Sequence, residues 1–121
     1  MHKKQHINGL VVFGVLIIIM VIINYRPSVP KIHCTEETLT PKPDIIMLAT
    51  WWCPYCSQAR RYFHNNDISY CEYDIENSAE GKRLYDEVNG RGIPVLLIGG
   101  QQINGFDEIS IETALSELHS S

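Results

Sequence analysis

The chain has 121 residues, which is the size of one small domain. With 45% hydrophobic and 20% charged residues, its composition is ordinary for a globular protein. All 14 acidic residues follow Cys34, so the C-terminal part is strongly acidic, and this charge argues against nucleic acid as a partner.

The N-terminal region, residues 1–25, is predicted to be a membrane anchor. Residues 7–23 carry no charge and only one clearly polar side chain, that of Asn8. A helix of this length is just long enough to cross a thin bilayer, and Tyr25 follows it at an interface position. The alternative is a cleaved signal peptide with Lys3 and Lys4 in its basic start. We favour an uncleaved anchor, because the apolar core is longer than usual and no Ala-x-Ala-like cleavage site follows it.

The charges on the two sides of this segment predict its orientation. Lys3, Lys4 and the N-terminal amine precede it, whereas Arg26 and Lys31 follow it. The positive-inside rule therefore favours a cytoplasmic N-terminus. The remainder of the chain is then expected outside the cytoplasm, for example in a periplasm.

Residues 26–43 are predicted to be a linker. They hold four of the six prolines and show no sustained hydrophobic period, so we expect an extended, stiff spacer. Four strands are then expected, at Asp44–Ala49, Ile68–Asp74, Gly92–Ile98 and Gln101–Ile103. Three helices are expected between and after them: from Pro54 to about Asn65, from about Asn77 to Asn89, and after Gly105 with Ile111, Ala114, Leu115 and Leu118 facing inward.

The order β-α-β-α-β-β-α predicts an α/β domain with a four-stranded mixed sheet. Its first two strands form a parallel pair, because a helix connects them. The last two form a hairpin through Gly99-Gly100. Helices on both faces would cover the sheet.

Two cysteines, Cys53 and Cys56, stand at the junction between the first strand and the first helix. Unpaired backbone N–H groups and the helix dipole at such a position favour an anionic sulfur, so this spacing is typical of a redox dithiol. The alternative is half of a zinc site, but the sequence has no second cysteine or histidine pair at ligand spacing. We therefore favour thiol–disulfide chemistry and expect no bound metal.

Three short motifs together resemble the glutaredoxins of the thioredoxin superfamily, over about residues 44–119. Cys53-Pro54-Tyr55-Cys56 matches the active site of the dithiol members letter for letter. Arg91-Gly92-Ile93-Pro94 resembles the segment that ends in their cis-proline, and Asn104-Gly105-Phe106-Asp107-Glu108 resembles their glutathione-binding turn. The chain departs from the family pattern at Thr50, where a lysine is usual, at Trp52 and at Asn104.

The resemblance implies a role for each of these residues. Cys53 would be the nucleophile and Cys56 the resolving thiol. Pro94 would be cis, and the Ile93 backbone would pair with a bound peptide or with glutathione. The remaining substrate-site or glutathione-site residues would be Thr50, Trp52, Tyr55, Arg91, Gly105, Phe106 and Asp107.

Several of these residues also have plainer explanations. For Tyr55 and the tryptophans, packing is the alternative to a docking surface, and we expect Trp52 to be exposed and Trp51 to be partly buried. Arg91 would pair with the glycyl carboxylate of glutathione or remain a solvated charge. Asp107 would hold the γ-glutamyl end, cap a helix, or do both.

The remaining cysteines, Cys34 and Cys71, are expected to form a structural disulfide. Four cysteines are an even number, and in an oxidising compartment the two outside the motif would pair. Such a bridge would tie the linker to the sheet.

The leading hypothesis is an enzyme: a monomeric, membrane-tethered thiol–disulfide oxidoreductase with glutathione as co-substrate. Its substrates would be protein disulfides or glutathione mixed disulfides. One alternative is an extracytoplasmic disulfide carrier that does not use glutathione. Another is a glutathione-dependent iron–sulfur binding module, against which Pro54 argues by resemblance.

Overall fold

The computed structural model describes residues 2–25 and 27–121, and the side chains from Ile7 onward within these ranges. A four-stranded sheet with the order β2-β1-β3-β4 lies at its centre. The strands are β1 (Ile45–Ala49), β2 (Tyr70–Asp74), β3 (Val95–Ile98) and β4 (Gln101–Asn104). β1 pairs with β2 in parallel and with β3 antiparallel, and β3 and β4 form the hairpin. The predicted mixed sheet is therefore confirmed.

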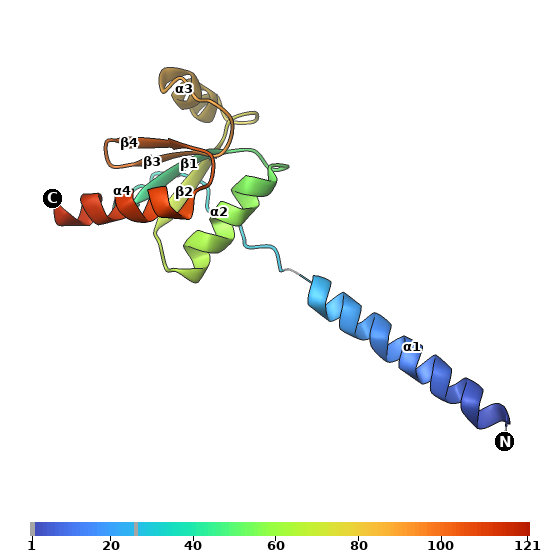
Figure 1. The fold of residues 1–121 in the computed structure, drawn as a ribbon. Coiled ribbons are helices and arrows are strands. Elements are labelled where there is room, and N and C mark those ends of the chain that lie inside the picture. Colours follow the sequence, from blue (N-terminus) through green and yellow to red (C-terminus); the bar gives the residue numbers. More distant parts are fainter. Residues whose placement is uncertain (1, 26) are drawn as a thin grey trace.

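Helices cover the sheet on both faces (Figure 1). α2 (Pro54–Asn65) and α4 (Glu108–Ser120) share one hydrophobic cluster with β1 and β3, in which Met47, Phe63 and Ile111 are fully buried. α3 (Ala79–Glu87) packs against the opposite face, where the backbone of Gly81 lies close to Asp74. A β-carbon at Gly81 would lie 2.6 Å from the carbonyl oxygen of Asp74, so only glycine fits there.

β1 begins one residue later than the sequence predicts, and two other strands begin two or three residues later, each for a local reason. β2 begins at Tyr70 instead of Ile68, because the N–H of Ile68 is bonded to the carbonyl of Phe63 and closes the end of α2. β3 begins at Val95 instead of Gly92, because Pro94 has no N–H for the ladder and its carbonyl accepts from Gly105.

Part of the segment predicted as an extended spacer is attached to the sheet. Glu72 donates its N–H to the carbonyl of Ile32 at 2.7 Å and accepts from the N–H of Cys34 at 3.0 Å. Residues 32–34 thus pair in parallel with the outer edge of β2 through a bridge at His33. The chain then turns through Thr35–Leu39 before it enters β1.

α1 (His2–Asn24) extends away from the sheet (Figure 1). Its segment Ile7–Asn24 is long and apolar enough to cross a membrane, and none of it is buried against the rest of the protein. A signal sequence would meet the same criteria of length and composition. Arg26 and the side chains of Lys3 and Lys4, on which the predicted orientation depends, lie outside the described residues.

Candidate dithiol site

Cys53 and Cys56 lie at the N-terminus of α2, directly after the turn that leaves β1. Cys53 is the N-cap residue, with an extended backbone (φ −79°, ψ 117°). Pro54 occupies the first turn, where a backbone N–H would have no partner within the helix. The backbone N–H of Cys56 donates to the Sγ of Cys53 at 3.1 Å. Both cysteines are free thiols and are almost completely buried. The sulfur of Cys53 therefore sits where a negative charge is best accommodated.

The sulfur of Cys53 also faces the segment that precedes β3. Its Sγ lies 3.8 Å from the carbonyl oxygen of Ile93, so the thiol can donate a weak S–H···O hydrogen bond to it. The Ile93–Pro94 peptide bond is cis, as the resemblance implies. Pro94 is fully buried and Ile93 is half-buried.

The environment of Cys56 opposes its ionisation. Burial, and next the hydrogen bond with Cys53, raise the pKa of Cys56 to about 12. The backbone N–H of Thr50 and the positive charge of Arg60 act in the opposite direction. The two thiols thus differ in their surroundings, since the sulfur of Cys53 accepts a backbone N–H at the helix start and burial opposes ionisation of Cys56.

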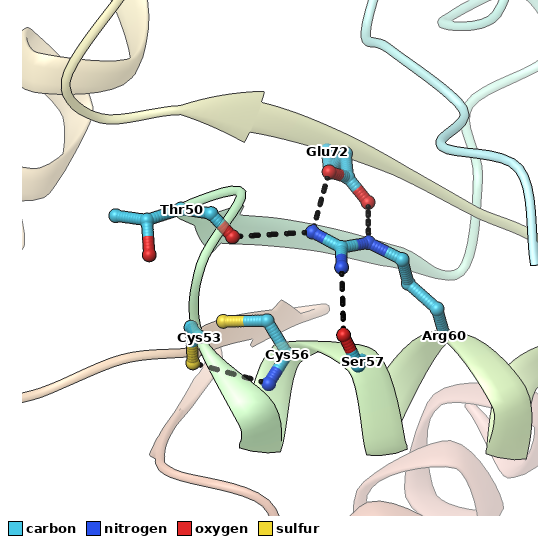
Figure 2. Close-up of polar contacts among 6 residues, drawn as sticks. All are labelled: Thr50, Cys53, Cys56, Ser57, Arg60 and Glu72. Atoms are coloured by element: carbon cyan, nitrogen blue, oxygen red, sulfur yellow. Dashed lines mark hydrogen bonds and ion pairs between the residues drawn. The ribbon is translucent and has the colours of Figure 1, made fainter. Parts of the chain in front are cut away.

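A buried ion pair lies beside the dithiol, and the sequence analysis did not identify it (Figure 2). Arg60 of α2 donates through Nε and a terminal nitrogen to both carboxylate oxygens of Glu72 on β2, at 2.7 and 2.9 Å. Both side chains are only 4% exposed. Burial alone would lower the pKa of Arg60, but the hydrogen bond and the charge of Glu72 outweigh it and the pKa is raised. The signal in the sequence is the spacing of Cys56 and Arg60, which puts them on one face of a helix.

The aromatic residues around Cys53 are all exposed. Trp51, Trp52 and Tyr55 are 64, 53 and 59% exposed, respectively. The expectation that Trp51 is partly buried is therefore wrong, because the turn between β1 and α2 directs it to solvent. The indole N–H of Trp52 donates to the carboxylate of Glu76 at 3.1 Å. Three exposed aromatic side chains thus flank the two cysteines in the chain.

Hydrogen bonds join the two other motif loops to each other. The N–H of Gly105 donates to the carbonyl of Pro94 at 2.7 Å, and the N–H of Arg91 donates to the side-chain oxygen of Asn104 at 3.1 Å. Because Ile93 faces Cys53, all three motifs meet at one end of the sheet. The structure thus brings most of the predicted site residues together.

The individual residues of these loops differ in what they offer to a ligand. The side chain of Arg91 is exposed, and Phe106 is half-buried against Tyr62, with ring centroids 5.7 Å apart. Asp107 caps α4 by accepting from the backbone N–H of Ser110 at 2.9 Å. Hydrogen bonding from the side chain of Ser110, and next from its backbone, lowers the pKa of Asp107. The side chain of Thr50 is 2% exposed, so it is turned away from solvent.

Cys34 and Cys71 are joined by a disulfide bond with a Cα–Cα distance of 4.9 Å. Cys71 is fully buried in β2, directly before Glu72. The bridge ties residues 32–34 to the strand that carries the acidic partner of Arg60. Among the described residues there is no group of three or more His, Cys, Asp or Glu side chains that could share a metal ion.

Comparisons with known proteins agree with this geometry. Residues 45–103 match the glutaredoxin family model. A glutaredoxin of Pseudomonas aeruginosa is 24% identical over 68 residues, which cover 55% of this chain and 81% of that protein.

Solved structures show the same fold. The glutaredoxin of Archaeoglobus fulgidus superposes with a TM-score of 0.54 at 15% identity, covering 69% of this chain and 96% of that one. The buckwheat glutaredoxin–glutathione complex superposes with a TM-score of 0.51 at 21% identity, covering 72% of this chain and 94% of that one. The fold is thus thioredoxin-like, and residues 45–103 are similar to the glutaredoxins.

Proposed function

We propose that this protein is a thiol–disulfide oxidoreductase that uses Cys53 as nucleophile and Cys56 as resolving thiol. The observation that carries the proposal is the contrast between the two sulfurs. Cys53 accepts a backbone N–H at a helix N-terminus, whereas Cys56 is fully buried with a pKa raised, by that burial first, to about 12. This contrast sets the order of attack.

In the first step the thiolate of Cys53 attacks one sulfur of a substrate disulfide. A mixed disulfide forms and the other substrate sulfur leaves as a thiolate. Cys56 then gives up its proton to water and attacks the Sγ of Cys53. The bond to the substrate breaks, the second substrate thiolate leaves, and Cys53 and Cys56 become the disulfide, so that two electrons have passed to the substrate.

Glutathione is the co-substrate that the neighbouring loops favour. The Ile93 carbonyl lies 3.8 Å from the Sγ of Cys53, so the Ile93 backbone can pair there with an extended peptide such as glutathione. The N–H groups of Phe106 and Asp107 before α4 can bind a carboxylate, and the exposed Arg91 offers a guanidinium for a second one. A glutathione complex of buckwheat glutaredoxin shares this fold.

The site of action would be a membrane surface outside the cytoplasm. α1 supplies a segment that can span a bilayer, and residues 26–43 connect it to the domain. The Cys34–Cys71 disulfide is typical of an oxidising compartment. We propose a single-pass protein with a cytoplasmic N-terminus and an extracytoplasmic, monomeric catalytic domain.

A coupled assay of glutathione-disulfide turnover on the full chain in detergent tests this function. Cys53→Ser should abolish turnover, because no nucleophile remains. Cys56→Ser should retain turnover of glutathione mixed disulfides, which need only one thiol, and should lose reduction of protein disulfides. Full activity of Cys53→Ser would refute the proposed function.

A second candidate, a disulfide carrier that does not use glutathione, is favoured by two observations. Thr50 replaces the usual lysine and is buried, and the exposed aromatic side chains of Trp51, Trp52 and Tyr55, which flank the two cysteines in the chain, offer contact area to a protein partner. The same assay separates the two candidates. A carrier would ignore glutathione but would exchange its Cys53–Cys56 disulfide with a reduced protein substrate.

A further inference from the structure

The proposed mechanism does not explain how the buried thiol of Cys56 loses its proton. Cys56 must become a thiolate to attack Cys53, yet its sulfur is fully buried in a cluster to which β1, β3 and α4 contribute only apolar side chains. Burying a charge without a partner is costly. Some group near Cys56 has to stabilise the negative charge during this step.

Few ionisable groups surround Cys56. Cys53 precedes Cys56 at the N-cap of α2, and Arg60 lies one helical turn after Cys56. On β2, Glu72 and Tyr70 lie against Arg60 and act on its charge. Arg60 is the one cation among the described residues that both is buried and acts on Cys56.

Arg60 is held in one orientation by partners on three sides (Figure 2). The carboxylate of Glu72 accepts two hydrogen bonds from Arg60, one from Nε and one from a terminal nitrogen. The same terminal nitrogen lies 3.4 Å from the carbonyl of Thr50, and the other lies 3.5 Å from the hydroxyl of Ser57. A guanidinium fixed in this way keeps its charge in place while the thiol reacts.

Glu72 is itself fixed by the edge of the sheet. Its backbone bonds to Ile32 and Cys34 on the outer side of β2, and the disulfide of the adjacent Cys71 attaches that outer segment. The side chain of Glu72 is only 4% exposed, so water has little access to its bonds with Arg60. Its negative charge offsets part of the positive charge that reaches Cys56.

We propose that Arg60 is a positioning residue for the resolving step, and that Glu72 sets how much of its charge Cys56 experiences. Arg60 contributes in two ways. It provides a buried positive charge one turn from the sulfur, and it anchors the carbonyl of Thr50, whose own N–H is directed to Cys56. The inference rests on the proposed function, because it concerns the second half of the same reaction.

The proposal predicts opposite effects for the two members of the pair. Arg60→Gln removes the positive charge and should slow the attack by Cys56. Glu72→Gln keeps a hydrogen-bond acceptor for Arg60 but removes the opposing charge, and should speed the attack at neutral pH. A purely structural pair would give losses of the same sign, since breaking it from either side disturbs the same packing.

A nitrobenzoate disulfide, mixed in less than equimolar amount with the reduced full chain in detergent, separates the two steps. Attack by Cys53 breaks the reagent disulfide and releases one coloured nitrothiobenzoate. Attack by Cys56 on the resulting mixed disulfide releases a second one. The first phase reports Cys53, and the second reports Cys56 alone, as its absence in Cys56→Ser would verify.

In Arg60→Gln the second phase should be about three- to fourfold slower at neutral pH for each unit by which the pKa of Cys56 rises, because the thiolate becomes rarer but more nucleophilic. Its pH profile should move to higher pH. In Glu72→Gln the pH profile of the second phase should move to lower pH. Arg60→Lys should resemble the wild type. Arg61→Gln is the matched control, because it removes the same charge from the next position of α2, and should leave both phases unchanged.

The double variant Arg60→Met/Glu72→Leu controls for loss of folding, because apolar replacement of both members of a buried ion pair usually preserves stability. Its second phase should be slow, like that of Arg60→Gln. The proposal is overturned if the double variant resolves at the wild-type rate, or if Arg60→Gln and Glu72→Gln shift the profile in the same direction. A missing first phase in the wild type would instead refute the proposed function itself.

Discussion

Gly105 donates its backbone N–H to the carbonyl oxygen of Pro94 across 2.7 Å, and this bond joins the turn before α4 to the loop before β3. Ile93, the neighbour of Pro94, faces the sulfur of Cys53 at 3.8 Å. The bond therefore determines how the candidate glutathione turn lies relative to the dithiol. It also depends on a backbone conformation that favours glycine, since φ of Gly105 is +101°.

Gly105→Ala should consequently weaken both the fold and the use of glutathione. A β-carbon meets no atom within 4 Å, so the cost is backbone strain alone. We expect a loss of about 1–2 kcal/mol in the free energy of unfolding, measured in urea. The Michaelis constant for glutathione disulfide should rise. Gly100→Ala, at an open position without positive φ, is the control and should change neither quantity much.

The buried pair of Arg60 and Glu72 should dominate the response of the fold to single charge changes. Arg60→Met alone leaves the Glu72 carboxylate buried without its partner, and we expect a loss of about 3–5 kcal/mol in unfolding free energy. Adding Glu72→Leu should restore much of that loss. Denaturation curves of the two variants measure both losses. If Arg60→Met were as stable as the wild type, the ion pair would not be desolvated.

The disulfide between Cys34 and Cys71 should stabilise the domain without taking part in turnover. Its sequence separation of 37 gives about 4 kcal/mol by the loop-entropy estimate. The double variant Cys34→Ser/Cys71→Ser should lose stability of that order and keep the first nitrobenzoate phase. Mass mapping without reductant provides the direct check, and two free thiols at these positions would contradict the bridge.

Asp107 should make the start of α4 sensitive to acid. Its hydrogen bond with Ser110 lowers the pKa of the carboxyl from the ordinary 3.8, so the folded state binds this proton less tightly than the unfolded chain does. The contribution is present above the unfolded pKa and is lost as pH falls through the folded one. Asp107→Asn keeps a capping oxygen without the charge, and its stability should lack this part of the acid dependence in urea titrations from neutral pH downward.

Much of the fold followed from local patterns in the sequence. The apolar run before Cys53, the proline at the start of α2 and the glycine pair between β3 and β4 predicted the order of elements, which the structure confirms. These signals are short in range, because each depends on residues within one turn or hairpin. The three motifs could also be predicted to meet, because the resemblance fixed their order.

Contacts between distant segments could not be predicted in the same way. Helical spacing places Arg60 on the same face as Cys56, but nothing local identifies Glu72 as its buried partner, since charged residues are usually exposed. The prolines near Ile32 favoured an extended spacer that only the expected Cys34–Cys71 bridge would tie to the sheet. Its backbone pairing with Glu72 depends on the open edge of β2, for which the spacer has no local signal. The burial of Thr50 and the exposure of Trp51 depend on the turn between β1 and α2, for which the sequence has no separate signal.

The most direct test of the dithiol assignment is the intact mass of single-cysteine variants after incubation with glutathione disulfide. Cys56→Ser should gain one glutathione, and peptide mapping should place it on Cys53. Cys53→Ser should gain none under the same conditions, because Cys56 is buried and protonated. Equal labelling of both variants, or a glutathione on Cys56 alone, would contradict the assignment of Cys53 as the nucleophile.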